Sequence, residues 1–180
     1  SEMAVDVDHM LSLIDSNTVA IVGSAPQYAH GTVDPIDRLS AIAAARGIGL
    51  HVDCCLGGFL VPFLARAGGS LPSAFDFSLP GVTSISCDPH KYGFAPKGCS
   101  VLMFRSHEVR RAATALCHPP AALRGTARLS ACNIGAAAQL RHHMYTYVTQ
   151  WTGGIYATPT ILGSRPGGVV AATWAAMMLH

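Results

Sequence analysis

Two lysines carry the clearest chemical signal in this sequence. Lys91 and Lys97 are the only lysines, and all the other residues counted among the 12 Lys and Arg are arginines. Both lie in one short stretch, residues 86–98. A lysine can lose its proton when it is desolvated and can then attack a carbonyl group, whereas an arginine cannot. The stretch is therefore a candidate for amine chemistry, and the alternative is a pair of surface lysines in an arginine-biased chain.

A short strand must position these lysines. Residues 82–86 include three β-branched residues and follow Gly81, a pattern that predicts a buried strand. Asp88 and the proline after it end this strand, so that Lys91 follows where the chain leaves the sheet. Ligand sites of open α/β sheets lie at such strand ends.

The residues before this strand predict a strand, a helix and a second strand. Strands are expected at 18–22 and 49–52, and the helix between them is expected to begin with Asp34 as N-cap and Pro35 at its first position, and to end at Gly47. This spacing is typical of a βαβ crossover, which makes the two strands parallel neighbours. We therefore predict an α/β fold with a mostly parallel sheet flanked by helices.

Three further elements complete the expected layer structure. A first helix is expected to start at Asp6 or Asp8 and to reach about Ser16. Residues 99–104 are expected to return to the sheet as a strand. A helix over 169–179 is apolar nearly all round, so we expect it to be buried.

The stretch 86–98 also resembles a family motif. Its pattern S-x-D-x-H-K-Y-G-x-x-P-K-G resembles the lysine motif of fold-type I pyridoxal phosphate enzymes in the group II decarboxylase superfamily, and is most similar to that of sphingosine-1-phosphate lyases. The resemblance implies that pyridoxal 5'-phosphate is the cofactor, attached through Lys91, with His90 helping to bind its phosphate. Lys97 is then expected to meet the substrate's phosphate as a point charge, and a solvated turn lysine is the alternative.

Asp53 follows the predicted strand 49–52 and has two interpretations. It is either the N-cap of a helical segment over 57–67, or an anion at a strand end facing Lys91. The pattern H-V-D-x-x-L-G-G-F over 51–59 resembles that of the lyases. The resemblance implies that Asp53 keeps the pyridine nitrogen protonated, which allows the ring to act as an electron sink.

The loop 24–31 resembles the lyase pattern S-x-P-Q-x-x-H-G. By this resemblance Ser24 hydrogen-bonds an oxygen of the cofactor, and His30 lines the entrance for the substrate. Each residue also has a simpler interpretation, because a loop serine is usually a turn residue and a loop histidine is more often structural.

Two glycine-rich patterns near the C-terminal end, over 153–160 and 163–168, are the most lyase-specific signals. Their glycines let the backbone approach a phosphate, Ser164 can donate a hydrogen bond, and Arg165 adds positive charge. In the family this loop reaches the cofactor phosphate of the neighbouring subunit, which implies a homodimer. A Gly/Pro turn before a helix is the alternative.

A segment of roughly thirty residues, 111–140, has no counterpart in the family pattern, which resumes at 141. A loop of this length is uncommon inside a compact domain. Our hypothesis is a retained intron or a gene-model error, and the alternative is a lineage-specific surface insertion. The predicted organisation is thus a first part of the cofactor-binding large domain over 1–110, the insertion, and its continuation over 141–180, with an N-terminal segment and a C-terminal small domain absent.

The composition argues against several classes of protein. No apolar run reaches the roughly 18 residues of a membrane span. The six cysteines have no C-x-x-C pair or zinc spacing, so reduced thiols in a cytosol-facing compartment are expected and no metal site. All ten acidic residues lie within 1–108, yet the six arginines after 108 are scattered rather than clustered with aromatic residues. Nucleic-acid binding is therefore not expected.

The resemblance, taken over the whole chain, implies an aldehyde lyase. Its substrate would be a phosphorylated long-chain base such as sphingosine 1-phosphate, cleaved by a retro-aldol step into phosphoethanolamine and a fatty aldehyde. The family further implies the endoplasmic reticulum membrane, facing the cytosol. The alternatives are a group II amino-acid decarboxylase, which shares Asp53 and Lys91, and an inactive truncated fragment.

Overall fold

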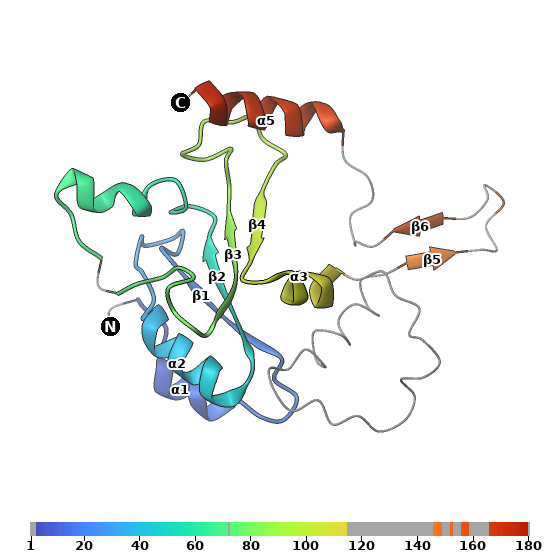
Figure 1. Ribbon diagram of the computed structural model, residues 1–180. Helices are drawn as coiled ribbons and strands as arrows, with labels where there is room; N and C mark the ends of the chain where they lie inside the picture. The colour runs from blue at the N-terminus through green and yellow to red at the C-terminus, as the bar shows by residue number, and fades with distance from the viewer. Residues whose placement is uncertain are drawn as a thin grey trace. The chain divides into compact units, whose positions relative to one another are not determined.

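The computed structural model describes residues 3–71, 73–114, 146–148, 152, 156–158 and 166–179, and Figure 1 shows their elements. The chain divides into two units. The first comprises Ser1–Arg105 with Pro166–His180, and the second comprises Ser106–Arg165. The expected insertion lies largely outside the described residues.

A four-stranded sheet organises the first unit (Figure 1). Its strands are β1 (Ala20–Ser24), β2 (Gly49–Cys54), β3 (Val82–Cys87) and β4 (Val101–Phe104), in that order across the sheet. The first three are parallel and β4 is antiparallel to β3. The predicted α/β fold with its βαβ crossover and mostly parallel sheet is confirmed.

Two helices cover one face of this sheet. Helix α2 (Ile36–Arg46) packs on β1 and β2, and α1 (Val7–Leu13) packs on α2. The α2 helix ends at Gly47, which has a φ of 64° and so occupies the left-handed region that favours glycine. The core between α2 and the sheet contains side chains that are fully buried: Ile36 and Leu39 of α2, Leu50 and Val52 of β2, and Val82 of β3.

The helix starts differ in part from the expectation. Asp6 is the N-cap of α1 and accepts a hydrogen bond from the His9 amide at 2.9 Å, as predicted, although α1 ends at Leu13 rather than about Ser16. The predicted cap of α2 is wrong. Pro35 occupies the N-cap position, and the carboxylate of Asp34 instead accepts hydrogen bonds from two distant backbone amides.

Two adjacent glycines allow the chain to turn tightly after β2. A Cβ atom on Gly57 would lie 2.4 Å from the carbonyl oxygen of Ala25, and one on Gly58 would lie 2.3 Å from the Cβ of Cys87 at the end of β3. A side chain at either position would force the backbone apart. The 3-10 helix η1 (Val61–Ala67) follows, so the segment 57–67 is not the helix that Asp53 was expected to cap.

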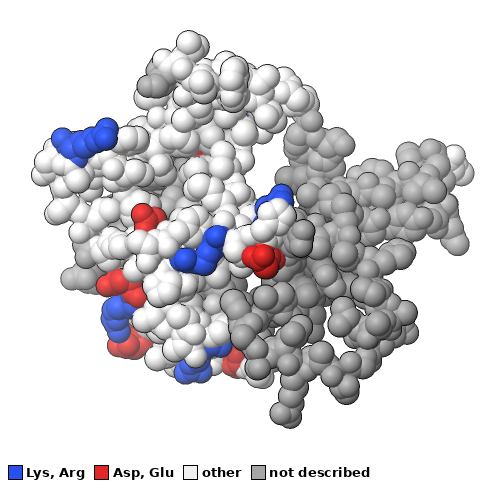
Figure 2. All heavy atoms as spheres, viewed as in Figure 1, with Lys and Arg blue, Asp and Glu red and all other residues white. Residues whose placement is uncertain are grey.

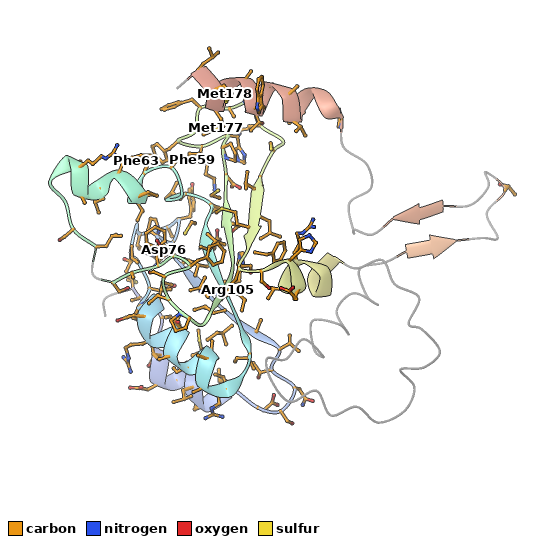
Figure 3. The ribbon with its side chains drawn as sticks, viewed as in Figure 1. Phe59, Phe63, Asp76, Arg105, Met177 and Met178 are labelled. Atoms are coloured by element: carbon orange, nitrogen blue, oxygen red, sulfur yellow. The ribbon has the colours of Figure 1, made fainter. Side chains whose placement is uncertain are left out.

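Arg105 ties the end of β4 to the loop before β3, and Figure 3 shows its position. Its guanidinium donates to the carbonyl oxygens of Phe77 at 2.9 Å and Val82 at 2.6 Å, and also to that of Leu79. The same group lies 5.6 Å from the centroid of the Phe77 ring. These contacts fix the loop that enters β3.

Helix α5 (Gly167–Leu179) also belongs to the first unit. It was expected to be buried, and this expectation is wrong for the structure described. Thr173 is its only buried residue, whereas Trp174 is 65% exposed and Met178, labelled in Figure 3, is 67% exposed. A helix that is apolar on all sides needs neighbours on all sides, and none of the described elements covers its outer faces.

The second unit contains helix α3 (His107–Thr114) and an antiparallel pair of strands, β5 (Thr146–Val148) and β6 (Tyr156–Thr158).

No helix among the described residues is long and apolar enough to cross a membrane. Charged side chains of both signs lie close together low on the face shown in Figure 2. Arg38 of α2 pairs with Asp8 of α1 at 3.0 Å.

Candidate active site

The face of the sheet opposite α2 carries a row of polar side chains. In β2 the buried residues alternate with half-buried ones, so that His51 and Asp53 share one face while Leu50 and Val52 point into the core. The neighbouring strands add hydroxyl groups to this face. Ser24 of β1 lies opposite Asp53, and Ser86 of β3 lies opposite it on the other side.

Asp53 lies near the carboxyl end of β2 and is held by two donors. Its Oδ1 accepts a hydrogen bond from the Cys55 amide at 2.9 Å and one from the Ser86 hydroxyl at 3.1 Å. Burial by itself would raise the pKa of Asp53, but these hydrogen bonds and the charge of His51 together hold the pKa below its ordinary value. Asp53 is therefore a carboxylate at neutral pH, and it does not cap a helix.

His51 contacts a hydroxyl group with each of its ring nitrogens. Its Nδ1 lies 2.8 Å from the Oγ of Ser84, and its Nε2 lies 3.1 Å from the Oγ of Ser86. Burial lowers the pKa of His51, and the charge of Asp53 only partly opposes this shift. The imidazole is consequently neutral at neutral pH.

Lys91 lies in the turn that follows β3, where its amide donates to the carbonyl oxygen of Asp88 at 3.1 Å. Its ammonium group pairs with the Asp88 carboxylate at 3.0 Å, and its side chain is 28% exposed. A hydrogen bond to Cys55 raises the pKa of Lys91, burial opposes this shift, and Asp88 adds to it. The ammonium form of Lys91 is thus favoured here, because an anion accompanies the lysine into the partly buried site.

Asp88 is the centre of this turn. Besides Lys91, its carboxylate accepts a hydrogen bond from the Ser100 hydroxyl at 2.6 Å and lies 3.8 Å from the Nε2 of His90. The Nδ1 of His90 donates to the carbonyl oxygen of Cys99 at 2.9 Å, since a carbonyl can only accept. The two ends of the loop 88–100 are thus fastened together beside the lysine.

Cys55 connects the two halves of the site. Its amide donates to Asp53, and its side chain is hydrogen-bonded to Lys91. The amine and the ionised carboxylate therefore belong to one cluster at the carboxyl ends of adjacent parallel strands, which is where α/β proteins bind their ligands.

Comparisons with known proteins identify the family. The family model of the pyridoxal-dependent decarboxylase conserved domain matches residues 5–119. The chain belongs to this family. Among its relatives is the sphingosine-1-phosphate lyase of Arabidopsis thaliana, which is 46% identical over 165 residues, or 92% of this chain and 24% of the relative. The chain thus spans about a quarter of that protein's length.

Solved structures agree with this assignment. A sphingosine-1-phosphate lyase of Burkholderia pseudomallei superimposes with a TM-score of 0.70 at 43% identity, over 99% of this chain and 34% of the other. A glutamate decarboxylase of Lactobacillus brevis superimposes with a TM-score of 0.63 at 23% identity, over 98% of this chain and 33% of the other, and this likeness concerns the fold alone.

Pyridoxal phosphate is the cofactor implied by membership of this family, and the residues present fit it. The pyridine ring needs an anion that remains ionised beside its nitrogen, and Asp53 meets this need. Its Oδ1 accepts the hydrogen bonds from the Cys55 amide and the Ser86 hydroxyl, which favour the ionised form. Lys91 supplies a partly exposed amine nearby in the same cluster. Among the described residues no group of His, Cys, Asp and Glu is arranged to hold a metal ion.

The structure places the other predicted site residues in different parts of the fold. Ser24 ends β1 next to Asp53 in the sheet, with its backbone fixed by Asp34. His30 lies in an exposed turn, where its Nδ1 is 3.1 Å from the Oε1 of Gln27. Lys97 is exposed in the turn before β4. Ser164 and Arg165 lie outside the described residues.

Sequence reasoning missed several members of the cluster. The residues not predicted to take part are Cys55, Ser84 and Ser100, with His51, Ser86 and Asp88 noted only as parts of motifs. The alternation of polar and apolar residues in 50–54 was a signal that could have identified the polar face. No sequence pattern predicted the contact between Asp88 and Ser100, because the two residues lie at opposite ends of one loop.

Proposed function

We propose that this chain forms the cofactor-binding part of a pyridoxal phosphate-dependent lyase that acts on phosphorylated long-chain bases such as sphingosine 1-phosphate. The reaction breaks the C2–C3 bond of the base in a retro-aldol step and yields phosphoethanolamine and a fatty aldehyde. The observation that carries the proposal is the 46% identity to the Arabidopsis lyase over 92% of this chain.

Asp53 and Lys91 take the central roles in this proposal. Pyridoxal phosphate, when bound, supplies the electron sink that accepts the electron pair of the breaking bond. Asp53 accepts a hydrogen bond from the cationic ring nitrogen, and its lowered pKa keeps it able to do so throughout the neutral range. Lys91 supplies the amine that attaches the cofactor, and to react it must first transfer its proton and leave Asp88.

The remaining predicted residues bind phosphate groups or line the site. His90 adjoins Lys91 and helps to bind the cofactor phosphate, with its ring held by the carbonyl oxygen of Cys99. Ser24 donates to a cofactor oxygen from the end of β1. Lys97 pairs with the substrate phosphate, which suits its exposed position six residues beyond Lys91.

His30, Ser164 and Arg165 complete the proposed substrate and cofactor contacts. In this proposal His30 lines the substrate entrance, and the loop with Ser164 and Arg165 reaches the cofactor phosphate of a second subunit. The protein therefore acts as a homodimer. Its substrate is a membrane lipid product, which agrees with a location at the endoplasmic reticulum membrane, facing the cytosol.

Borohydride trapping tests the cofactor site. The protein is incubated with pyridoxal phosphate, reduced and digested, and the pyridoxyl group is located by mass spectrometry. With Lys91, Lys97 and the N-terminal amine as the only amines, the result is close to binary. We expect stoichiometric label on Lys91, no label in Lys91→Arg, and full label in the matched control Lys97→Arg. Label shared between the two lysines would contradict the assignment.

A product assay tests the reaction. The protein should release phosphoethanolamine and a long-chain aldehyde from a phosphorylated long-chain base, and should release no carbon dioxide from amino acids. Lys91→Ala should abolish turnover, whereas Lys97→Ala should raise KM with a smaller effect on kcat. Release of carbon dioxide from an amino acid without aldehyde formation would instead make the protein a decarboxylase.

A further inference from the structure

Four polar side chains form a continuous hydrogen-bonded row across β2 and β3. The row runs from Ser84 to His51 at 2.8 Å, from His51 to Ser86 at 3.1 Å, and from Ser86 to Asp53 at 3.1 Å. All four residues are half-buried, on the face of the sheet opposite α2. Only the last of them, Asp53, has a place in the proposed chemistry.

The proton positions in this row follow from the chemistry of its last member. A carboxylate has no proton to donate, so the hydroxyl of Ser86 must donate to Asp53. That hydroxyl has a single proton, so its oxygen must accept in the bond to His51, and the proton of this bond belongs to Nε2. A neutral imidazole carries one ring proton, and therefore Nδ1 accepts from the hydroxyl of Ser84.

We infer that His51 is a positioning residue whose Nε2–H holds the Ser86 hydroxyl as a donor to Asp53, and that the charge of Asp53 selects the ring tautomer that leaves Nδ1 as an acceptor for the Ser84 hydroxyl. The inference rests on the proposed function only where it places Asp53 against the cofactor. The direction of the hydrogen bonds depends on the ionised carboxylate of Asp53 and the neutral imidazole of His51, and on no cofactor.

The alternative tautomer shows why this selection matters. With the proton on Nδ1, the Nε2 of His51 would be an acceptor and would compete with Asp53 for the single proton of Ser86. The carboxylate would then lose a donor for part of the time, although no contact of its own had been changed. The charge of Asp53 disfavours this state, because the carboxylate can only accept the proton of Ser86, whereas the hydroxyl of Ser84 can donate or accept and follows by donating to Nδ1.

The tautomer can be measured without cofactor or substrate. Nitrogen-15 NMR of the imidazole ring distinguishes a protonated Nε2 from a protonated Nδ1. In the unliganded protein at neutral pH we expect His51 to carry its proton on Nε2. In Ser86→Ala, which removes the partner of Nε2, we expect a mixture of the two tautomers, and in the control Ser78→Ala, exposed in the loop before β3 and outside the row, no change. A proton on Nδ1 in the unaltered protein would overturn the inference.

A double-variant cycle tests whether His51 acts through Ser86. We expect His51→Phe and Ser86→Ala each to weaken binding of pyridoxal phosphate by about tenfold, the size of one hydrogen bond to a charged group. The double variant should then bind no more weakly than either single variant. His51→Gln retains a donor for Ser86 and an acceptor for Ser84, so it should restore most of the affinity. Additive losses, or failure of glutamine to restore binding, would contradict a positioning role.

The two experiments separate this inference from the proposed function. If the unaltered protein bound no cofactor, the proposed function would fail while the NMR result still decided the state of His51. In that case the Asp53 titration replaces the affinity: its pKa should rise in Ser86→Ala and in His51→Phe, and should remain unchanged in Ser78→Ala. An unchanged titration in both row variants would overturn the inference.

Discussion

Asp34 offers the sharpest test of how the fold positions the site. Its side chain is nearly buried, at 8% exposure, and it accepts hydrogen bonds from the Val5 amide at 2.9 Å and the Ser24 amide at 2.8 Å. A hydrogen bond to a charged group contributes about 1.5 to 3 kcal/mol. Asp34→Ala removes two such bonds. Because both bonds are only partly buried, we take the lower value for each and expect the free energy of unfolding to fall by about 3 kcal/mol.

Asp34→Asn refines this prediction. One amide oxygen can still accept, but the amide nitrogen faces a second donor, so about half of the loss should remain. Asp37→Ala is the matched control, because Asp37 is exposed one residue into α2 and its loss should cost less than about 1 kcal/mol. Urea unfolding followed by circular dichroism measures all three. If Asp34→Ala and Asp37→Ala were equally stable, the buried carboxylate would not be holding the end of β1.

Three further predictions concern the site and its surroundings. The hydrogen bond to Cys55 raises the pKa of Lys91 most, and the Asp88 anion adds to this shift. Asp88→Asn removes that anion, so the pKa of Lys91 should fall. Lys91 should then be acylated faster at mildly alkaline pH, while Lys97 should be unaffected. Gly58→Ala places a Cβ 2.3 Å from a side chain of β3, so it should destabilise the fold by about 1 to 3 kcal/mol in urea unfolding and reduce cofactor binding. Burial raises the pKa of Cys54 to about 12, so Cys54 should resist alkylation in the native protein and react only after unfolding, as peptide mapping would show.

The local pattern of the sequence was sufficient to predict the layer structure. The runs 18–22, 49–52 and 82–86 lie within one or two residues of β1, β2 and β3, because each is a short segment that contains β-branched residues and is bounded by turn residues. Gly47 ends its helix as expected, since a left-handed residue after the last turn favours glycine. These features depend on neighbours in the sequence and can be read from it.

Contacts between distant residues could not be predicted in this way. An aspartate before a proline usually caps the helix that follows, but Asp34 finds buried donors at Val5 and Ser24, which lie 29 and 10 residues away. The raised pKa of Lys91 depends in the same way on a distant residue, because Cys55 contacts it from the end of β2, whereas Lys91 follows β3. The resemblance identified Lys91 and Asp53, but not the groups that set their charge.

The position of the hydrogen-bonded row depends on an irregularity of the sheet. The register of β2 with β3 shifts between Leu50 and His51, so that Leu50 lies opposite Val82 while His51 lies opposite Ser84. The residue passed over is Thr83, whose hydroxyl donates to the Leu50 carbonyl oxygen at 3.0 Å.

This shift links the core to the site. Strict alternation from Val82 onward would direct Ser84 and Ser86 into the core and Ile85 to the polar face. The extra residue reverses this order, so that Ile85 is buried and both serines lie beside His51. The hydroxyl that donates to Asp53 is therefore placed by the same bulge that allows the core to close, as bulges near active sites often redirect a side chain.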